Sequence, residues 1–143
     1  MFKIPEDRLF SEKHLWVKKG KRKTATIGIT EYFSLCNLEI LDIDLPEEDE
    51  EYEKDEIFGS METVEEIYDL VMPISGKIIS VNEKVLEDVE ILNEDPYDEG
   101  WLIKVKINNP LELEELLPPE DYEMKLSEEI EEALPSEFSE EEE

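Results

Sequence analysis

Apolar and polar residues alternate along several short segments of the chain, which is the pattern of β-strands with one buried face. Residues 41–45 show this alternation and are followed by Pro46. Residues 15–17 and 24–29 flank a basic segment with a glycine, so together they predict a β-hairpin with a polar turn. The clearest alternation lies in 101–107, where the apolar positions are Trp101, Ile103, Val105 and Ile107.

The segment 57–71 predicts another hairpin, which turns near residues 63–66. A further strand is expected over 77–81, after the turn-forming residues 73–76. The acidic segment 47–56 predicts a solvated loop. Many short strands separated by turns predict a mostly β fold, a compact sandwich or barrel with short peripheral α-helices. Those helices are expected at 30–37, at 83–91, at 113–117 and directly after Pro118.

The length of 143 residues suits one domain, which we expect over residues 1–126, followed by an acidic tail over 127–143. The tail holds nine glutamates and no basic residue, and we expect one amphipathic turn near Ile130 and disorder beyond Pro135. No run approaches the ~20 apolar residues of a membrane span. The N-terminus has no apolar signal region, which predicts a cytoplasmic location.

The chain carries 42 acidic and 14 basic residues, and its formal net charge is −28. That charge argues against nucleic acid and anionic membranes as partners, because both bind basic surfaces. The charge is uneven: five basic residues form a cluster at 18–23, while residues 47–56 hold eight acids. The basic cluster is expected to be the solvated tip of the first hairpin, and pairing with the acidic tail is an open alternative.

Several short motifs follow one another along the chain. They are FSEKHLWV at 10–17, TIGIT at 26–30, LP at 45–46, PISG at 73–76, NEDPY at 93–97 and GWLIK at 100–104. Together with the hairpin sequence GSMETVEEIYDLVMP at 59–73, they resemble the glycine cleavage system H protein family. The resemblance covers roughly residues 5–124 and implies the barrel-sandwich hybrid fold of lipoyl and biotinyl domains.

In that family a lysine at the turn of this hairpin carries lipoic acid through an amide bond, and the resemblance places Glu65 at the position of the lysine. A carboxylate has no amine with which to form the amide, and the chain has no lysine between Lys54 and Lys77. The sequence therefore predicts that lipoate is not attached at the usual position, and we expect no cofactor. Glu65 is either an exposed turn residue or part of an acidic tip that docks on a partner.

A second departure lies in the first motif, where the family's His-Glu-Trp reads His14, Leu15 and Trp16. The resemblance implies that this acid helps to line a cleft for an amine-loaded arm. Leu15 cannot pair with an amine, and Lys13 beside the cleft repels a cationic arm end. Asp69 retains the family's acid next to the hairpin. The two departures together predict an altered function.

The ordinary H protein shuttles an aminomethyl group among the decarboxylase, the aminomethyltransferase and the dihydrolipoyl dehydrogenase. The resemblance therefore implies a protein that is not an enzyme and has no catalytic residue. We expect a binding or regulatory module that docks on glycine-cleavage components or on lipoate-handling enzymes. The candidate docking residues surround the hairpin turn and are Glu62, Thr63, Val64, Glu65, Glu66 and Asp69.

The alternative is a carrier that uses Lys54, Lys77 or Cys36 as its attachment point, and a stable relic without a partner is a third interpretation. Cys36, the single cysteine, is expected to be a small buried apolar residue, and a sulfur-carrying thiol is the alternative. The only histidine, His14, is expected to pack beside Trp16. No metal site is expected, because one histidine and one cysteine supply too few ligands and the acidic segments lack the spacing of a calcium loop.

Overall fold

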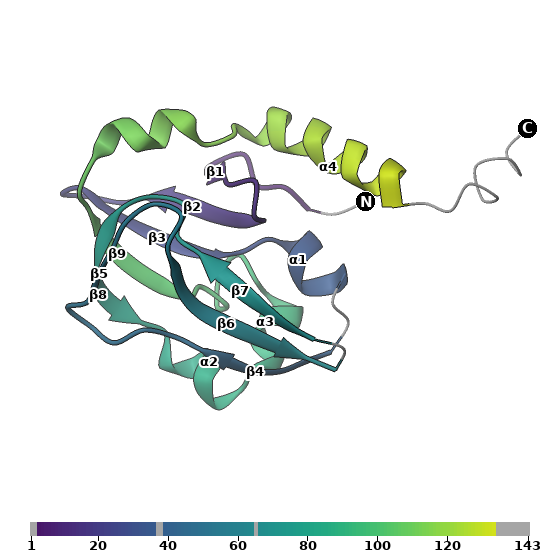
Figure 1. Cartoon of the computed structure of the whole chain (residues 1–143), viewed down its shortest axis with the longest axis horizontal. Helices are drawn as coiled ribbons and strands as arrows, with labels where there is room; N and C mark the ends of the chain where they lie inside the picture. The colour runs from purple at the N-terminus through teal and green to yellow at the C-terminus, as the bar shows by residue number, and fades with distance from the viewer. Residues whose placement is uncertain (1–2, 37–38, 65, 134–143) are drawn as a thin grey trace, which may run out of the picture.

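Two antiparallel β-sheets form the body of the molecule (Figure 1). The computed structural model describes residues 3–36, 39–64 and 66–133. Within these residues, one sheet has the strand order β1-β2-β3-β9-β8-β5, and the other has the order β4-β6-β7. The strands are β1 (Leu9–Phe10), β2 (Leu15–Lys19), β3 (Thr24–Ile29), β4 (Ile40–Asp44), β5 (Glu51–Tyr52), β6 (Ile57–Thr63), β7 (Ile67–Val71), β8 (Gly76–Val81) and β9 (Ile103–Ile107).

Short helices connect the strands, and one longer helix covers part of the six-stranded sheet. The side chain of Asn82 accepts a hydrogen bond from the N–H of Lys84 at 3.1 Å and so begins the first helix after β8. The longest helix lies along β1 and β2 (Figure 1). The helices are α1 (Glu31–Cys36), α2 (Glu83–Glu87), α3 (Glu90–Glu94), the 3₁₀-helix η1 (Pro110–Glu115) and α4 (Pro119–Ala133).

One apolar core contains side chains of both sheets. Val17, Ile27 and Val105 come from the six-stranded sheet, and Met61 and Leu70 come from the three-stranded sheet. Each is almost completely buried, because alternate residues of these strands point to the same side. Burial of one such side chain contributes roughly 1.5–3 kcal/mol, so this core is what holds the sheets together.

A second, mostly aromatic cluster lies on the opposite face of β2, beneath α4. In this cluster the rings of Phe10 and Tyr122 stack with centroids 4.7 Å apart. The indole N–H of Trp16 donates to the carbonyl of Pro96 at 3.0 Å. Because both faces of β2 are covered, its first three residues are all buried. The members of the cluster are Phe10, Trp16, Tyr97, Tyr122 and Leu126.

The mostly β fold with short helices is confirmed, and so are both predicted hairpins, β2–β3 and β6–β7. The helix expected over 30–37 is α1, and the helix expected after Pro118 is α4. The strand expected over 101–107 begins at Ile103, since Trp101 and Leu102 precede the ladder. The strands of the described residues form two sheets and no single closed barrel.

Some segments differ from the sequence-based expectation. Two residues of the acidic segment form β5, because pairing with β8 uses backbone groups and leaves the Glu51 side chain in solvent. The helix expected over 83–91 is divided into α2 and α3 at Asp88, whose backbone is extended. A register shift between Ile40 and Asp42 breaks the alternation of β4, so Leu41 is exposed rather than buried.

The C-terminal segments also differ in part. The stripe expected over 113–117 is the 3₁₀-helix η1, in which the side chain of Asn109 caps the N–H of Leu111 at 3.2 Å. Helix α4 continues past position 127, where we place the start of the acidic tail. The division between domain and tail stays a prediction. Residues 134–143, including Pro135, and the side chain of Ile130 lie outside the described residues.

Candidate docking site at the β6–β7 hairpin

Hydrogen bonds across its two ends fix the turn between β6 and β7. The N–H of Thr63 donates to the carbonyl of Glu66 at 2.9 Å, and the Thr63 hydroxyl donates to the same carbonyl at 2.8 Å. The N–H of Glu66 donates to the Thr63 hydroxyl oxygen at 3.2 Å. The N–H of Val64 donates to the carbonyl of Glu39 at 3.3 Å, which joins the turn to the segment before β4. These bonds therefore hold the described residues on either side of position 65.

The predicted docking residues differ in accessibility. Glu62, Val64, Glu66 and Asp69 are exposed, whereas Thr63 is buried and shapes the turn from within. Glu65, whose identity motivates the docking hypothesis, lies outside the described residues. The hairpin thus brings four accessible candidates together at its turn and along its outer side.

Two apolar side chains beside the turn were missed by the sequence-based reasoning. Ile67 is 64% exposed and is the cross-strand partner of Glu62. Leu41 is 49% exposed on β4, next to the strand that carries Glu62. Exposed apolar residues that lie together among charged ones mark protein interaction sites. We refer to Leu41, Glu62, Val64, Glu66 and Ile67 as the tip surface.

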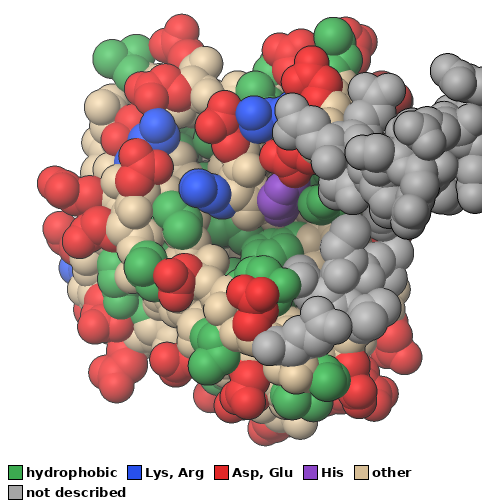
Figure 2. All heavy atoms as spheres, turned by 45° about the vertical axis from the view of Figure 1, so that its right-hand side comes forward, with side chains coloured by type: hydrophobic (Ala, Val, Ile, Leu, Met, Phe, Trp, Pro, Cys, Tyr) green, Lys and Arg blue, Asp and Glu red, His purple; other side chains and the backbone are tan. Residues whose placement is uncertain are grey.

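A cleft of about 440 Å³ lies beside the hairpin. Figure 2 shows the imidazole of His14, the only histidine, within a hollow whose floor is apolar and whose rim carries acidic side chains. Lys13 borders the cleft, as expected from the sequence. The cleft therefore combines one imidazole with charges of both signs. Its lining residues are Glu12, Lys13, His14, Tyr32, Phe33, Tyr68, Asp69 and Glu129.

His14 joins α4 to the first hairpin through a chain of hydrogen bonds. Its Nδ1 lies 2.9 Å from the hydroxyl of Tyr122, and its Nε2 lies 2.9 Å from a carboxylate oxygen of Glu129. The Tyr122 hydroxyl lies 3.0 Å from the hydroxyl of Thr30, which accepts a hydrogen bond from the N–H of Phe33. These groups connect α4 to the residues that directly precede β2 and α1, at the wall of the cleft.

The protonation states of this chain follow from its burial. Desolvation lowers the pKa of His14, and the neighbouring Glu129 carboxylate opposes that effect. Burial also raises the pKa of the Tyr122 phenol, so the phenol is protonated at neutral pH. A neutral imidazole then donates a hydrogen bond from its Nε2–H to Glu129, and its Nδ1 accepts a hydrogen bond from the Tyr122 hydroxyl. Both ring nitrogens of His14 therefore have hydrogen-bond partners while the imidazole is neutral.

Two expectations about the first motif are wrong. Leu15 does not line the cleft: it is fully buried in the main core, and its N–H donates to the Ser11 hydroxyl at 3.2 Å. His14 directly precedes β2 with a left-handed φ of 67°, and none of the ring contacts of the described residues joins it to Trp16. It packs instead on Tyr32, with ring centroids 4.7 Å apart. Only the Lys13 change therefore touches the cleft.

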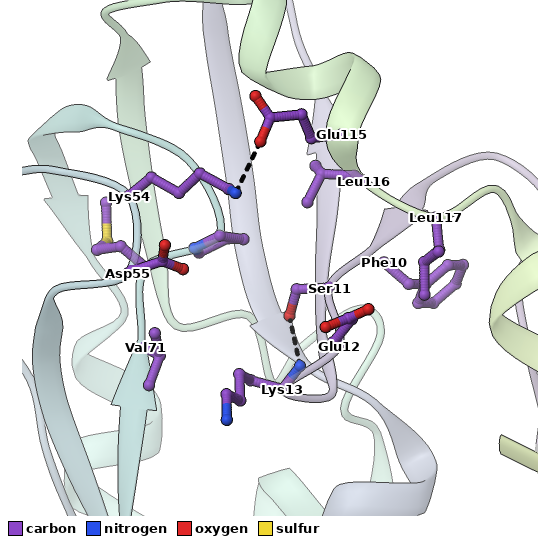
Figure 3. Close-up of a pocket in the computed structure, with 12 residues that line it drawn as sticks. Phe10, Ser11, Glu12, Lys13, Lys54, Asp55, Val71, Glu115, Leu116 and Leu117 are labelled. Carbon is purple, nitrogen blue, oxygen red and sulfur yellow. Dashed lines mark hydrogen bonds and ion pairs between the residues drawn. The ribbon is translucent and has the colours of Figure 1, made fainter. Parts of the chain in front are cut away.

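The alternative attachment residue Lys54 lies at the opposite end of the hairpin from the turn. Figure 3 shows its side chain directed at Glu115, and the ammonium lies 2.9 Å from that carboxylate. The hydrogen bond to Glu115 raises the pKa of Lys54, which favours the protonated form of the amine. β6 separates Lys54 from the turn, and its seven residues span roughly 23 Å at about 3.3 Å per residue.

The other two alternatives lie on different elements. Lys77 is in β8 of the six-stranded sheet, and its ammonium lies 4.0 Å from Asp49. Cys36 is the last residue of α1, and its side chain lies outside what the structure describes. Neither of the two lysines is at the β6–β7 turn. The described geometry therefore offers no lysine in place of the one that the resemblance implies at position 65.

Two antiparallel sheets around one core, with a tight hairpin turn beside a cleft, define a lipoyl-type domain. The family model for glycine cleavage H-protein matches residues 8–129. The glycine cleavage system H protein of Carboxydothermus hydrogenoformans is 44% identical over 126 residues, which cover 88% of this chain and 96% of that protein. The one of Staphylococcus carnosus is 38% identical over 125 residues, which cover 87% and 98%.

A solved structure gives the same result. The crystal structure of a glycine cleavage system H protein from Mycobacterium marinum has a TM-score of 0.79 and 29% identity, and the match covers 87% of this chain and 99% of that chain. The chain belongs to the glycine cleavage H-protein family. Members of this family are carriers rather than enzymes and work with the decarboxylase and the aminomethyltransferase of the system. No described helix is long and apolar enough to cross a membrane.

Proposed function

We propose that this chain is an H-family protein that is not lipoylated at the usual position and acts in the cytoplasm as a docking module. It binds components of the glycine cleavage system, or other lipoate-handling enzymes, through the tip surface. The observation that carries the proposal is Glu65, a carboxylate where the family resemblance implies the lipoyl-bearing lysine. A carboxylate cannot form the amide, so the shape of the carrier is retained without its cargo.

The tip surface supports docking for two reasons. The Thr63 hydrogen bonds join Thr63 to Glu66, so the ends of the two strands lose little conformational entropy on binding. Its exposed apolar side chains, Leu41, Val64 and Ile67, supply contact area that burial in a partner would stabilise. The acids Glu62 and Glu66 beside them favour a partner with a basic entrance.

A carrier that uses another residue is the second candidate, and the Lys54–Glu115 ion pair counts against it. A lysine must be deprotonated to attack an activated lipoyl carboxyl, and this ion pair stabilises the protonated form. Its place at the base of the hairpin also keeps it away from the turn that the family presents to partners. The docking module is therefore the better supported function.

Binding to the purified decarboxylase and aminomethyltransferase from the same organism tests the proposal. We expect micromolar affinity that falls about tenfold or more in Val64→Asp, because the charge enters an apolar contact. Leu111→Asp is the matched control, since Leu111 is also an exposed apolar residue but lies on η1. Absence of binding to both components, or equal weakening by the control, would contradict docking through the tip.

A Glu65→Lys variant tests whether the missing amine is the reason for the missing cargo. We expect lipoate ligase to attach lipoate to this variant and not to the natural chain, because the rest of the turn is intact. If lipoate attaches but the loaded arm transfers poorly, Lys13 in the cleft is implicated, since Leu15 lies in the core. Lipoylation of the natural chain under the same conditions would overturn the proposal.

A further inference from the structure

Lysines from distant parts of the chain meet on the outer face of the six-stranded sheet. Lys104 and Lys106 are the exposed residues of β9, whose other three residues are buried. Lys106 is the cross-strand partner of Lys77 on β8, and Lys104 pairs with Thr26 on β3, which in turn pairs with Lys18 on β2. Cross-strand partners present their side chains on the same face, so these four lysines share one surface.

The turn between β2 and β3 extends this surface at its edge. Arg22 and Lys23 have φ values of 54° and 59°, a left-handed conformation that is uncommon for such residues. The turn is closed because the N–H of Gly20 donates to the carbonyl of Thr24 at 2.8 Å. We refer to the whole surface as the basic face; it comprises Lys18, Lys21, Arg22, Lys23, Lys77, Lys104 and Lys106.

The basic face contrasts with the composition of the whole chain, in which acids outnumber bases three to one, 42 against 14. Seven of the 14 bases lie on it. Acids lie at its edges: Lys18 is 3.4 Å from Asp7, Lys77 is 4.0 Å from Asp49, and Glu51 on β5 is the cross-strand partner of Lys77. Within the described part of the chain, Lys104 and Lys106 make no ion pair, although Lys104 lies 4.9 Å above the Trp101 ring.

One pair of lysines on the basic face is unfavourable for the stability of the sheet. Lys77 and Lys106 lie directly opposite each other, and like charges in that position destabilise a sheet. On its other side Lys77 is balanced by Glu51, but the ladder partners of Lys104 and of the other side of Lys106 are serine and threonine residues, so no acid in the ladder compensates these two lysines. Lys104 and Lys106 are therefore the uncompensated part of the face, and an anionic partner is the chemistry that they fit.

We infer that the basic face binds an acidic segment of a partner protein. The net charge of −28 repels such a segment from the remaining surface, so it approaches the molecule in one orientation. Nucleic acid fits less well, because its charge is continuous over a length that would extend beyond the face and meet the surrounding acids. This site is separate from the tip surface, which lies on the three-stranded sheet, and it does not depend on the proposed function.

Titration of the full chain with a synthetic oligoglutamate peptide, at low and physiological ionic strength, tests this inference. We expect saturable binding that weakens with salt, and a loss of affinity of about fivefold in Lys104→Gln/Lys106→Gln. The matched control is Lys84→Gln/Lys125→Gln, which removes the same charge from α2 and α4. Thermal unfolding of both variants checks that the fold is unchanged.

Each contrary outcome overturns the inference. No binding at low salt means that the face has no affinity for acidic segments. Equal weakening by the control pair means that net charge alone governs the interaction. Tighter binding of single-stranded oligothymidylate of the same formal charge means that the face recognises nucleic acid instead of protein.

Discussion

The two faces of the β6–β7 hairpin differ in what they do for the protein. On the inner face, Met61 and Leu70 are fully buried in the core shared by the two sheets. On the outer face, Glu62 and Ile67 are exposed partners across the same two strands. Because alternate residues serve different faces, the outer face and the turn can change while the packing of the hairpin stays the same. A carrier fold can therefore persist after the residue that holds its cargo is replaced.

The largest difference between the faces is expected from Leu70→Ala. Removal of a fully buried leucine leaves a cavity and costs about 2–5 kcal/mol of unfolding free energy. Urea denaturation followed by tryptophan fluorescence measures this loss. The control is Ile67→Ala on the outer face of the same strand, which we expect to change stability by less than about 0.5 kcal/mol. Similar losses in the two variants would mean that the faces are not separated as described.

A smaller effect is expected from Thr63→Val at the turn. The substitution keeps the shape of the buried side chain but removes the hydroxyl that both donates to and accepts from Glu66. We expect a loss of about 1 kcal/mol, because water can replace part of the bonding at the exposed Glu66. Thr26→Val on β3 is the control, and an equal loss there would show that the turn hydrogen bonds contribute nothing specific.

The cleft wall makes stability depend on pH through His14. Burial holds its pKa below the ordinary value of 6.5, so the unfolded chain binds a proton more readily than the folded one. The free energy of unfolding should therefore decrease as pH falls below 6.5, in a range above about pH 5 where carboxylates are still mostly ionised. Denaturant midpoints at several pH values measure this slope. A His14→Asn variant should flatten it, and an unchanged slope would exclude His14 as the source.

The smallest effect on stability, with a clear effect on binding, is expected from Ile67→Asp. Its side chain is 64% exposed, so the unfolding free energy should change by less than about 0.5 kcal/mol. Affinity for the glycine-cleavage components should fall, because Ile67 lies on the tip surface. Surface plasmon resonance with the purified components gives the affinity. If Ile67→Asp lowered the unfolding free energy as well as the affinity, the outer face would not be separate from the packing of the core.

Strand positions could be predicted wherever one face of a strand is buried. β9 alternates cleanly, and its exposed lysines follow directly from the pattern. β2 does not, because α4 covers its second face. The expectation that Leu15 lies at the cleft came from the family resemblance, and it missed the burial of Leu15 in the core. β5 could not be predicted from an acidic segment, since its pairing depends on backbone groups alone.

The site was predicted in part. The hairpin turn and Lys13 follow from the motifs, but the partners of His14 do not, because Tyr122 lies 108 residues further along the chain. No local pattern connects α4 to the first hairpin. The exposure of Ile67 could have been predicted from the sequence, since Ile67 occupies an outward position of a predicted strand. The exposure of Leu41 could not have been predicted, because it results from the register shift in β4.

The intact mass of the protein purified from its own source, with peptide mapping, tests the central claim most directly. The account predicts the unmodified mass of the chain and no lipoyl-bearing peptide, because Glu65 cannot form the amide and Lys54 is held by Glu115. A lipoyl-sized adduct mapped to Lys54, Lys77 or Cys36 would contradict it. The chain would then be a carrier that uses an attachment point outside the β6–β7 turn.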